Sequence, residues 1–389
     1  MKKKIAILGS TGSIGKTLID IIKKDKKNFE IVLLTADKNG DELIKQAKLL
    51  KVKNLIITNQ KSYDQVIKKR KNRNFKIYKN YMIFNKIFKN KIDYVMNSIS
   101  GIEGLKPTLT IIKYTKKIAL ANKESIICGW NLIHKKLKFY RTDFIPIDSE
   151  HFSINELTKN TNKNSIEKIY ITASGGPFLN KKVSSFKNIK IKNAIKHPTW
   201  QMGKKISVDS ATLVNKVYEL IEAKKIFNLD YSKFDILIQP TSYVHSIIKF
   251  NGGTLKVLIH NTSMKIPIFN SLYDTKKFKD KFSTDINIKL FNNLNLQKIP
   301  TKKFPINKIL TCLPKTDSLF ETVLVSANDT LVNLFLSKKI TFNDIHTCLY
   351  KVLSLKEFQK YKSKKPKNLS EILHLNEYVR LKTESLSVV

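Results

Sequence analysis

The first 150 residues alternate short apolar runs with amphipathic segments, and this alternation limits the possible folds more than any other feature. The runs at Lys4–Leu8 and Glu30–Thr35 have strand character, whereas Thr17–Lys24 and Gly40–Leu50 have helical spacing. Strands that alternate with helices form parallel sheets. Four further runs have strand character: Asn54–Ile57, Tyr94–Asn97, Lys117–Leu120 and Arg141–Pro146. The sequence predicts an α/β protein with an N-terminal Rossmann-like, doubly wound parallel sheet over residues 1–150.

The rest of the chain divides into three parts. Residues 151–270 mix strands with a helix at about Ala211–Phe227, which predicts a central α/β catalytic domain. Residues 271–308 are rich in Lys and Asn and have weak periodicity, so we interpret them as a connecting segment. Residues 309–389 have helical patterns at Leu319–Phe335, Phe342–Leu353 and Leu369–Lys382, which predict a small C-terminal helical bundle.

Composition narrows the function classes. No apolar run approaches the roughly 18 residues that a membrane span needs, so we expect a soluble protein with no membrane partner. The cysteines Cys128, Cys312 and Cys348 lack metal-type spacing, which favours a reducing, cytoplasmic location.

The net charge of +41 raises the alternative of nucleic-acid binding, with its steep salt dependence. Only four of the 72 basic residues are arginine, the preferred residue for phosphates and bases, and the lysines are spread along the whole chain. A solvated lysine surface with no nucleic-acid partner explains this pattern better.

The spacing Gly9-x-x-Gly12-x-x-Gly15 follows the first strand and opens a helix, as a dinucleotide-binding loop does. Glycine allows close approach of a pyrophosphate, and the helix N-terminus favours its charge. A tight turn without a ligand is the alternative. After the second strand, Lys38 and Asn39 suit the 2′-phosphate of NADPH, whereas Asp37 suits the free hydroxyl of NADH. These residues leave the choice of cofactor open.

Two acidic motifs indicate a divalent cation. Asp148 and Glu150 share one face if the preceding strand continues through them, and Glu219 lies on a helical face with Asn215 and Lys216. Carboxylate oxygens suit Mg²⁺ or Mn²⁺. The alternatives are a solvated acidic turn and an ordinary surface ion pair.

Three loops complete the candidate site. Asn122–Ser125 follows a strand, at the edge where open α/β sheets bind ligands. Thr172–Phe178 contains a Gly-Gly turn that can hold a phosphate, and His197–Gly203 has the large apolar residues of a lid over about 197–207. Each loop also has an interpretation without a ligand. Asn122–Ser125 is then a charged loop, Thr172–Phe178 is a plain turn, and His197–Gly203 is a loop that Trp200 anchors.

Together these motifs closely resemble the 1-deoxy-D-xylulose 5-phosphate reductoisomerase family. The signatures GSTGSIG, LANKES, DSEH, TASGGPF, HP-x-W-x-MG and SVDSATLVNK occur in the family's order over essentially the whole chain. The resemblance implies an NADP-dependent oxidoreductase that isomerises and reduces 1-deoxy-D-xylulose 5-phosphate, a phosphosugar, to 2-C-methyl-D-erythritol 4-phosphate in non-mevalonate isoprenoid synthesis. It also implies a homodimer that uses NADPH and Mg²⁺ or Mn²⁺.

The resemblance also implies residue roles. It assigns the metal to Asp148, Glu150 and Glu219, and catalysis to Lys123, Glu150 and His197. The implied substrate contacts are Lys123, Ser149, Glu150, Ser174, His197, Ser210, Asn215, Lys216 and Glu219. The implied cofactor contacts are Thr11, Gly12, Ser13, Ile14, Asp37, Lys38, Asn39, Asn122, Glu124 and Gly203.

Two points bear on these roles. The family usually has a small residue where Asp37 stands, which affects the preference for NADPH. Strand alternation would point Ser149 away from Asp148 and Glu150, so the strand must end or twist there.

An ordinary dehydrogenase of the homoserine or aspartate-semialdehyde type is the alternative enzyme class. It would share the N-terminal loop but would need no Asp-Ser-Glu motif.

Overall fold

The computed structural model describes residues 1–69, 75–273 and 286–387, which form two compact units. The first contains Met1–Ser125, Leu132–Asp148 and the segment that starts at Met264. The second contains Ile126–Asn131, Ser149–Ser263 and the C-terminal part of the chain. The predicted connecting segment, 271–308, lies partly outside the described residues, at 274–285. The four-part division of the chain stays a prediction.

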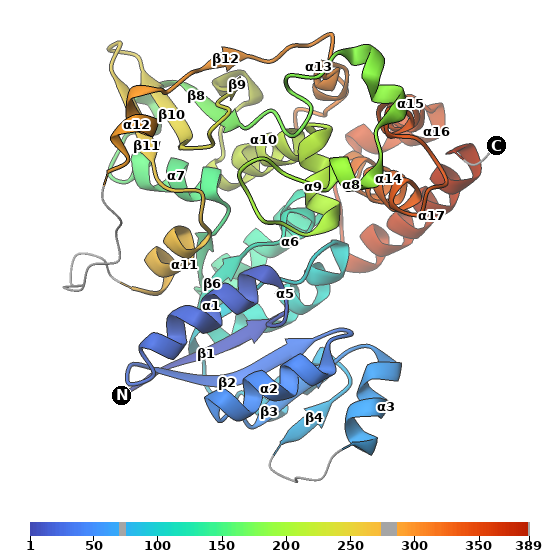
Figure 1. Ribbon diagram of the computed structural model, residues 1–389. Coiled ribbons are helices and arrows are strands. Elements are labelled where there is room, and N and C mark those ends of the chain that lie inside the picture. Colours follow the sequence, from blue (N-terminus) through green and yellow to red (C-terminus); the bar gives the residue numbers. More distant parts are fainter. Residues whose placement is uncertain (70–74, 274–285, 388–389) are drawn as a thin grey trace. The chain divides into compact units, whose positions relative to one another are not determined.

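The first unit is built on a seven-stranded sheet in the order β4-β3-β2-β1-β5-β6-β7 (Figure 1), and all of its pairings are parallel. The chain moves outward from β1 in both directions, so the order reverses between β1 and β5, as in a doubly wound fold. This confirms the predicted sheet. The strands are β1 (Lys3–Leu8), β2 (Phe29–Ala36), β3 (Asn54–Ile57), β4 (Lys76–Tyr78), β5 (Ile92–Asn97), β6 (Thr115–Leu120) and β7 (Asp143–Pro146).

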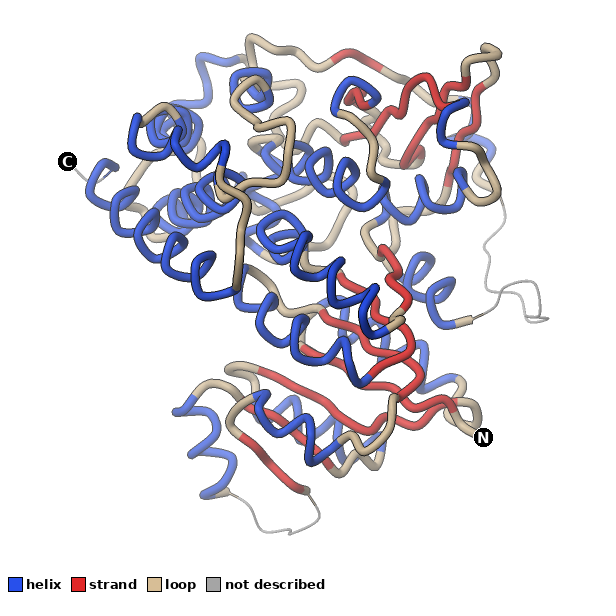
Figure 2. The backbone as a smooth tube through the Cα atoms, turned by 180° about the vertical axis from the view of Figure 1, so that it is seen from behind, coloured by secondary structure: helices blue, strands red, loops and turns tan. Residues whose placement is uncertain are grey.

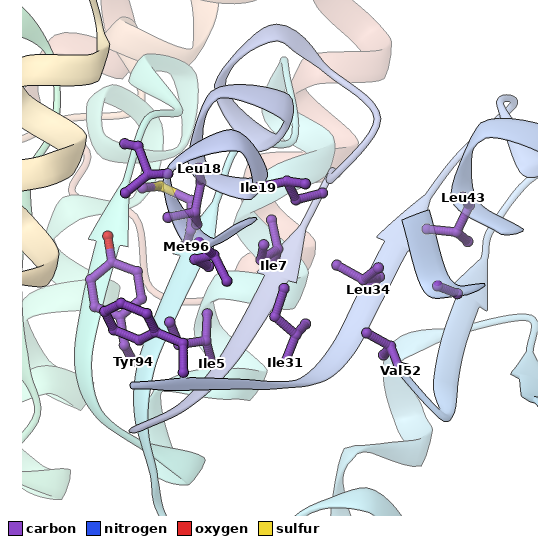
Figure 3. Close-up of a cluster of buried hydrophobic side chains, with 14 of the residues drawn as sticks. Ile5, Ile7, Leu18, Ile19, Ile31, Leu34, Leu43, Val52, Tyr94 and Met96 are labelled. Atoms are coloured by element: carbon purple, nitrogen blue, oxygen red, sulfur yellow. The ribbon is translucent and has the colours of Figure 1, made fainter. Parts of the chain in front are cut away.

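Helices connect these strands. The bounds are α1 (Ser13–Lys24), α2 (Gly40–Leu50), α3 (Gln60–Lys68), α4 (Phe84–Ile87), α5 (Leu105–Ile111) and α6 (Lys123–Tyr140). The core of the unit packs Ile5 and Ile7 of β1 against Leu18 and Ile19 of α1 (Figure 3). A late helix, α11 (Lys265–Leu272), joins the same core. The first unit is therefore completed by a segment more than a hundred residues beyond its last strand.

The second unit has a five-stranded sheet in the order β11-β10-β8-β9-β12, in which only β8 and β9 are parallel. Helices α7 and α10 both contact β8. The strands are β8 (Ile166–Ala173), β9 (Phe234–Ile238), β10 (Val244–Phe250), β11 (Leu255–Ile259) and β12 (Gln297–Lys298). The helices of this part are α7 (Ser149–Thr158), α8 (Ile191–Ala194), α9 (Lys204–Ala211) and α10 (Val214–Phe227).

The C-terminal part of the second unit is helical, as predicted (Figure 2). Helix α14 (Phe320–Leu336) is buried along most of its length, because α9, α15 (Phe342–Leu353) and α17 (Leu369–Ser387) all pack against it. Three shorter helices are α12 (Ile288–Asn292), α13 (Ile306–Leu310) and α16 (Lys356–Gln359). Among the described residues, no helix is both long and apolar enough to cross a membrane.

Gly15 allows α1 to pack closely against the loop that precedes it. A Cβ atom at Gly15 would lie 2.5 Å from the Cα of Ser10 and 2.6 Å from the carbonyl oxygen of Gly9. We expect Gly15→Ala to destabilise the first unit by about 2 kcal/mol, because backbone atoms would have to move. Urea denaturation followed by circular dichroism measures this change.

Gly12→Ala is the matched control, because a Cβ atom there would meet only the Gly9 carbonyl oxygen, at an ordinary 3.5 Å. It should cost less than about 1 kcal/mol. Equal shifts of the denaturation midpoint in the two variants would contradict this account of the loop.

Candidate active site

The glycine-rich loop between β1 and α1 presents backbone N–H groups at a helix N-terminus. Helix α1 begins at Ser13 without a side-chain cap and without an acidic residue in its first turn. The N–H groups of such a turn attract anions. Thr11, Gly12 and Ile14 lie on the same partly or fully exposed rim. The four residues that the resemblance assigns to the cofactor, Thr11 to Ile14, thus lie at this turn.

A buried polar network holds this loop to the end of β2. The N–H groups of Gly9 and Ser10 donate to the hydroxyl and carbonyl oxygens of Thr35, both at 2.9 Å. The Ser10 hydroxyl donates to Gln46 of α2 at 2.7 Å, and the Gln46 amide donates back to the Ser10 carbonyl at 3.1 Å. Sequence reasoning missed this network. Its only signal was a glutamine on the apolar face of a helix.

Hydrogen bonds fix the three residues after β2. The side chain of Asp37 accepts a hydrogen bond from the Thr58 hydroxyl at 2.9 Å, and the Lys38 carbonyl accepts one from Ser62 at 2.7 Å. Asn39 caps α2, because its side-chain oxygen accepts from the N–H of Glu42. All three predicted cofactor residues, 37–39, are exposed at the carboxyl edge of the sheet.

Asn122 joins two loops at the same edge of the sheet. Its side-chain oxygen caps α6 by accepting from the Ser125 N–H, and its amide nitrogen donates to the carbonyls of Ile99 and Gly101. Lys123 and Glu124 therefore lie in the first turn of α6, where Glu124 is buried.

The first unit also pairs Lys123 with Asp148. The two residues follow β6 and β7, which are neighbours in the sheet, and the Lys123 ammonium forms an ion pair with the Asp148 carboxylate. The sequence predicted roles for both residues but did not predict this contact.

The chain changes from strand to helix inside the DSEH motif. Strand β7 ends at Pro146 and α7 begins at Ser149. The strand thus ends before Asp148, so Asp148 and Glu150 do not share one face of a continuing strand. The helix also removes the difficulty with Ser149, whose hydroxyl donates to the Glu150 carboxylate at 2.5 Å.

At the centre of the second unit, one ammonium group bridges two buried carboxylates. Lys216 donates to both Glu150 of α7 and Glu219 of α10. Asn215 donates to the other oxygen of Glu219. Burial alone would lower the pKa of Lys216, but the two carboxylates outweigh burial and raise it. The predicted helical face of Asn215, Lys216 and Glu219 is thus present, and it is buried.

Helix α10 is preceded by a sharp turn. The helix predicted at about Ala211–Phe227 is present as α10, but it begins at Val214, and neither Asp209 nor Ser210 caps it. Both residues lie inside α9, and Asp209 instead accepts from Asn328 at 2.8 Å. Helix α10 starts after Leu213, a buried residue in the left-handed region at φ 61°, with no side-chain cap. Bulky residues rarely adopt this conformation, and such strain is concentrated at functional sites.

The Gly-Gly loop packs against the end of α9. Gly176 has φ 67°, and a Cβ atom there would lie 2.9 Å from the carbonyl oxygen of Ser210. Only glycine suits both the conformation and the space. This close packing brings the loop that contains Ser174 next to Ser210, and the resemblance assigns both residues to the substrate.

His197 is fixed in one tautomer. Its Nδ1 atom accepts hydrogen bonds from the N–H groups of Thr199 and Trp200, at 3.2 and 3.0 Å, so its proton lies on Nε2. Nε2 then donates to the Ser174 hydroxyl oxygen at 3.0 Å. Burial, together with the positive charge of Lys216, lowers the pKa of His197 to about 4.

The Ser174 hydroxyl can consequently make one further hydrogen bond, as a donor. Its oxygen accepts from the His197 ring and from the N–H of Gly176, at 3.1 Å. With both lone pairs engaged, the hydroxyl proton points to a further acceptor. Such a donor suits a phosphate oxygen.

The predicted lid has no regular structure from 195 to 203, and Gly203 is the cap residue of α9. Trp200 is half-buried and makes an edge-to-face contact with His245, with ring centroids 6.2 Å apart. His245 is a buried core histidine whose ring bonds to the His260 carbonyl, and burial lowers its pKa to about 3.

Comparison with known proteins agrees with this geometry. Residues 5–129 match the family model for 1-deoxy-D-xylulose 5-phosphate reductoisomerase, and residues 144–227 and 259–382 match models for its C-terminal domains. The 1-deoxy-D-xylulose 5-phosphate reductoisomerase of Pelagibacter ubique is 60% identical over 99% of this chain and 100% of its own length. That of a Sulfurihydrogenibium species is 39% identical over 92% of this chain and 93% of its own.

Solved structures extend the comparison to the fold. The reductoisomerase from Zymomonas mobilis in complex with NADPH has a TM-score of 0.86 and 28% identity, covering 100% of this chain and 99% of its own. A DOX-P reductoisomerase in complex with NADPH, fosmidomycin and magnesium has a TM-score of 0.90 and 29% identity, covering 99% and 98%. The chain is thus a member of the 1-deoxy-D-xylulose 5-phosphate reductoisomerase family.

Proposed function

We propose that this chain converts 1-deoxy-D-xylulose 5-phosphate to 2-C-methyl-D-erythritol 4-phosphate, using NADPH and a divalent cation, in non-mevalonate isoprenoid synthesis. The buried cluster of Glu150, Glu219 and Lys216 is the observation that carries this proposal. The family match extends over this cluster as well as the nucleotide loop. An ordinary dehydrogenase would require only the loop, so the reductoisomerase reaction is the better explanation.

Asp148, Glu150 and Glu219 would hold the cation, which is Mg²⁺ or Mn²⁺. The donor set fits, because the carboxylates of Glu150 and Glu219 already converge on one positive charge, the Lys216 ammonium. Asp148 is close to Glu150 along the chain, since only Ser149 separates the two. Three carboxylates and no sulfur or imidazole donor suit a hard cation that keeps sites for substrate oxygens.

The phosphate of the substrate would bind where α9 and α10 meet. Ser174 offers the hydroxyl proton that its other contacts leave available, and Ser210 lies beside the same loop, at the end of α9. The uncapped N-terminus of α10 and the positive charge of Lys216 favour an anion there. The neutral His197 ring would donate to the Ser174 hydroxyl oxygen and so orient that hydroxyl. Asn215 would contribute its amide.

The reacting end of the substrate would contact Lys123 and Ser149. When bound, the cation supplies Lewis-acid polarisation of the substrate oxygens, and NADPH supplies the hydride. Lys123 adds positive charge where negative charge develops on oxygen. Trp200 and Met202 would exclude water, which protects the fragments formed when the carbon–carbon bond breaks.

NADPH would bind to the exposed carboxyl edge of the seven-stranded sheet. The residues concerned are Thr11, Gly12, Ser13, Ile14, Asp37, Lys38, Asn39, Asn122, Glu124 and Gly203. All of these except Gly203 lie in loops or helix starts that follow β1, β2 and β6.

A homodimer in the cytoplasm completes the proposal. The edge strand β11 exposes Leu255 and Val257 by 59% and 43%, which suits contact with a second copy of the chain. The described cysteines are all free thiols, and this suits a reducing compartment. The partner of the protein would be a small phosphosugar rather than a nucleic acid or a membrane.

Removal of the cation should abolish turnover. We expect loss of NADPH absorbance with 1-deoxy-D-xylulose 5-phosphate and Mg²⁺, and none after treatment with EDTA. Glu219→Gln should lower kcat at least about 100-fold, because a ligand charge is lost. Electron paramagnetic resonance of Mn²⁺ should show weaker binding. Glu167→Gln, at an exposed ion pair with Lys249, is the control. Full turnover in EDTA would contradict the metal role.

Ser174→Ala should raise KM for the substrate roughly tenfold or more with little change in kcat, because a hydrogen bond to a charged group is lost. Steady-state kinetics at saturating NADPH measures both parameters. Ser185→Ala removes a hydroxyl that bonds only locally, to the Lys182 carbonyl at 2.6 Å, and should leave KM unchanged. An unchanged KM in Ser174→Ala would exclude Ser174 from the phosphate site.

His197 should remain neutral, with its proton on Nε2, throughout the pH range from 6 to 8. Its pKa of about 4 lies below the ordinary 6.5, so the ring gains its second proton only in clearly acidic solution. Nitrogen-15 spectra of labelled, ligand-free protein distinguish the two tautomers. A titration midpoint near 6.5, or a proton on Nδ1, would contradict the hydrogen bonding described for the lid.

A further inference from the structure

Asp37 has a fixed position at the ligand-binding edge of the first unit. It is the first residue after β2, and its side chain is exposed. The hydroxyl of Thr58, the first residue after the adjacent strand β3, donates to its carboxylate at 2.9 Å. The neighbouring main chains are also joined, since the Thr58 N–H donates to the Ala36 carbonyl at 3.1 Å. The carboxylate is therefore held by the sheet itself.

The next residue provides the opposite charge. The carbonyl of Lys38 accepts hydrogen bonds from the Ser62 hydroxyl at 2.7 Å and from the Gly40 N–H at 3.1 Å, which fixes its main chain. Within the described chain, no ion pair involves the Lys38 ammonium. A fixed negative charge and an available positive charge thus stand side by side at the end of β2.

Polar groups inside the edge support this position. Tyr81 interacts with the side chain of Thr35, two residues before Asp37. Burial raises the pKa of Tyr81 to about 12, and the negative charge of Asp37 acts in the same direction. Tyr81 therefore stays neutral and adds no negative charge beside Asp37.

The charges of Asp37 and Lys38 affect which nicotinamide nucleotide can bind at this edge. In doubly wound sheets the adenosine ribose lies at the end of the second strand, where a carboxylate accepts from a free 2′-hydroxyl. The same carboxylate repels a 2′-phosphate, whereas a lysine attracts it. Asp37 and Lys38 therefore act in opposite directions on one choice of ligand.

We propose that Asp37 is a specificity-determining residue that weakens the preference for NADPH over NADH, so that this enzyme accepts both reduced nicotinamides. The Lys38 ammonium attracts the 2′-phosphate, so NADPH still binds. The Asp37 carboxylate accepts from a free 2′-hydroxyl, so NADH binds as well. The proposal rests on the placement of the cofactor given in the proposed function.

The test uses two nucleotides that share adenosine and a 5′-phosphate: 2′,5′-ADP, which has a 2′-phosphate, and 5′-AMP, which lacks it. Calorimetric titration of the full chain gives a Kd for each. In Asp37→Asn the ratio of the Kd for 5′-AMP to the Kd for 2′,5′-ADP should rise roughly tenfold, as one repulsive charge is removed. The asparagine oxygen still accepts from Thr58, so the fold is preserved.

Two further variants make the result specific. Lys38→Gln should lower the same ratio, and opposite shifts from adjacent residues cannot come from a general loss of stability. Asp143→Asn removes an exposed charge at the amino end of β7, the opposite edge of a parallel sheet, and should leave the ratio unchanged. The ratio of kcat/KM for NADPH to that for NADH should follow the Kd ratio in every variant.

An unchanged Kd ratio in Asp37→Asn would overturn the proposal, as would equal shifts in Asp37→Asn and Asp143→Asn. Failure of the wild-type chain to bind either nucleotide would also overturn it. Turnover of the phosphosugar is measured separately and reports on the reaction. A chain that turns over with unchanged selectivity in Asp37→Asn would thus refute this inference and leave the proposed function intact.

Discussion

The second unit depends on the compensation of buried charge around Lys216. An unpaired ammonium or carboxylate in a protein interior loses several kcal/mol of hydration, and only close opposite charges and hydrogen bonds offset that loss. Glu150 and Glu219 supply these charges from two different helices. Because neither α7 nor α10 can bury its charges alone, the cluster forms only when the two helices pack together. The ring of His151 adds a hydrogen bond to the carbonyl of Glu219, at 2.9 Å.

The proposed cation site uses the same two carboxylates. Lys216 holds the two glutamates in place, because its ammonium donates a hydrogen bond to each carboxylate. A divalent ion that entered could take over the same carboxylates, and the Lys216 ammonium would then be available to an anion. The same lysine thus suits both the resting protein and a phosphate-bound state, and the uncapped start of α10 lies beside it.

The two units use polar groups in different ways. In the second unit, charges and a strained turn at Leu213 position side chains. In the first unit, neutral hydrogen bonds among Ser10, Thr35 and Gln46 position backbone, and they leave the first turn of α1 exposed. Neutral bonds suffice there because the anion is attracted by N–H groups and by the helix dipole rather than by a side-chain charge.

The sequence alone determined the periodic features and the local motifs. Strand–helix alternation predicted the parallel sheet, and Gly9, Gly12 and Gly15 predicted a phosphate loop, because both are set by neighbours in the chain. The i, i+3 and i, i+4 spacing placed Asn215, Lys216 and Glu219 on one helical face for the same reason. The predicted strand Arg141–Pro146 ends at the same residue as β7, but the sequence did not predict the helix that begins at Ser149.

Only the tertiary structure decided which distant residues meet. The pairing of Lys216 with Glu150 spans 66 residues, and α11 joins the core of the first unit from even farther along the chain. It also decided that His197 is a neutral donor to Ser174, because burial and two backbone N–H groups fix its proton. Such contacts depend on packing and on the loss of hydration, which are properties of the folded chain and have no period in the sequence.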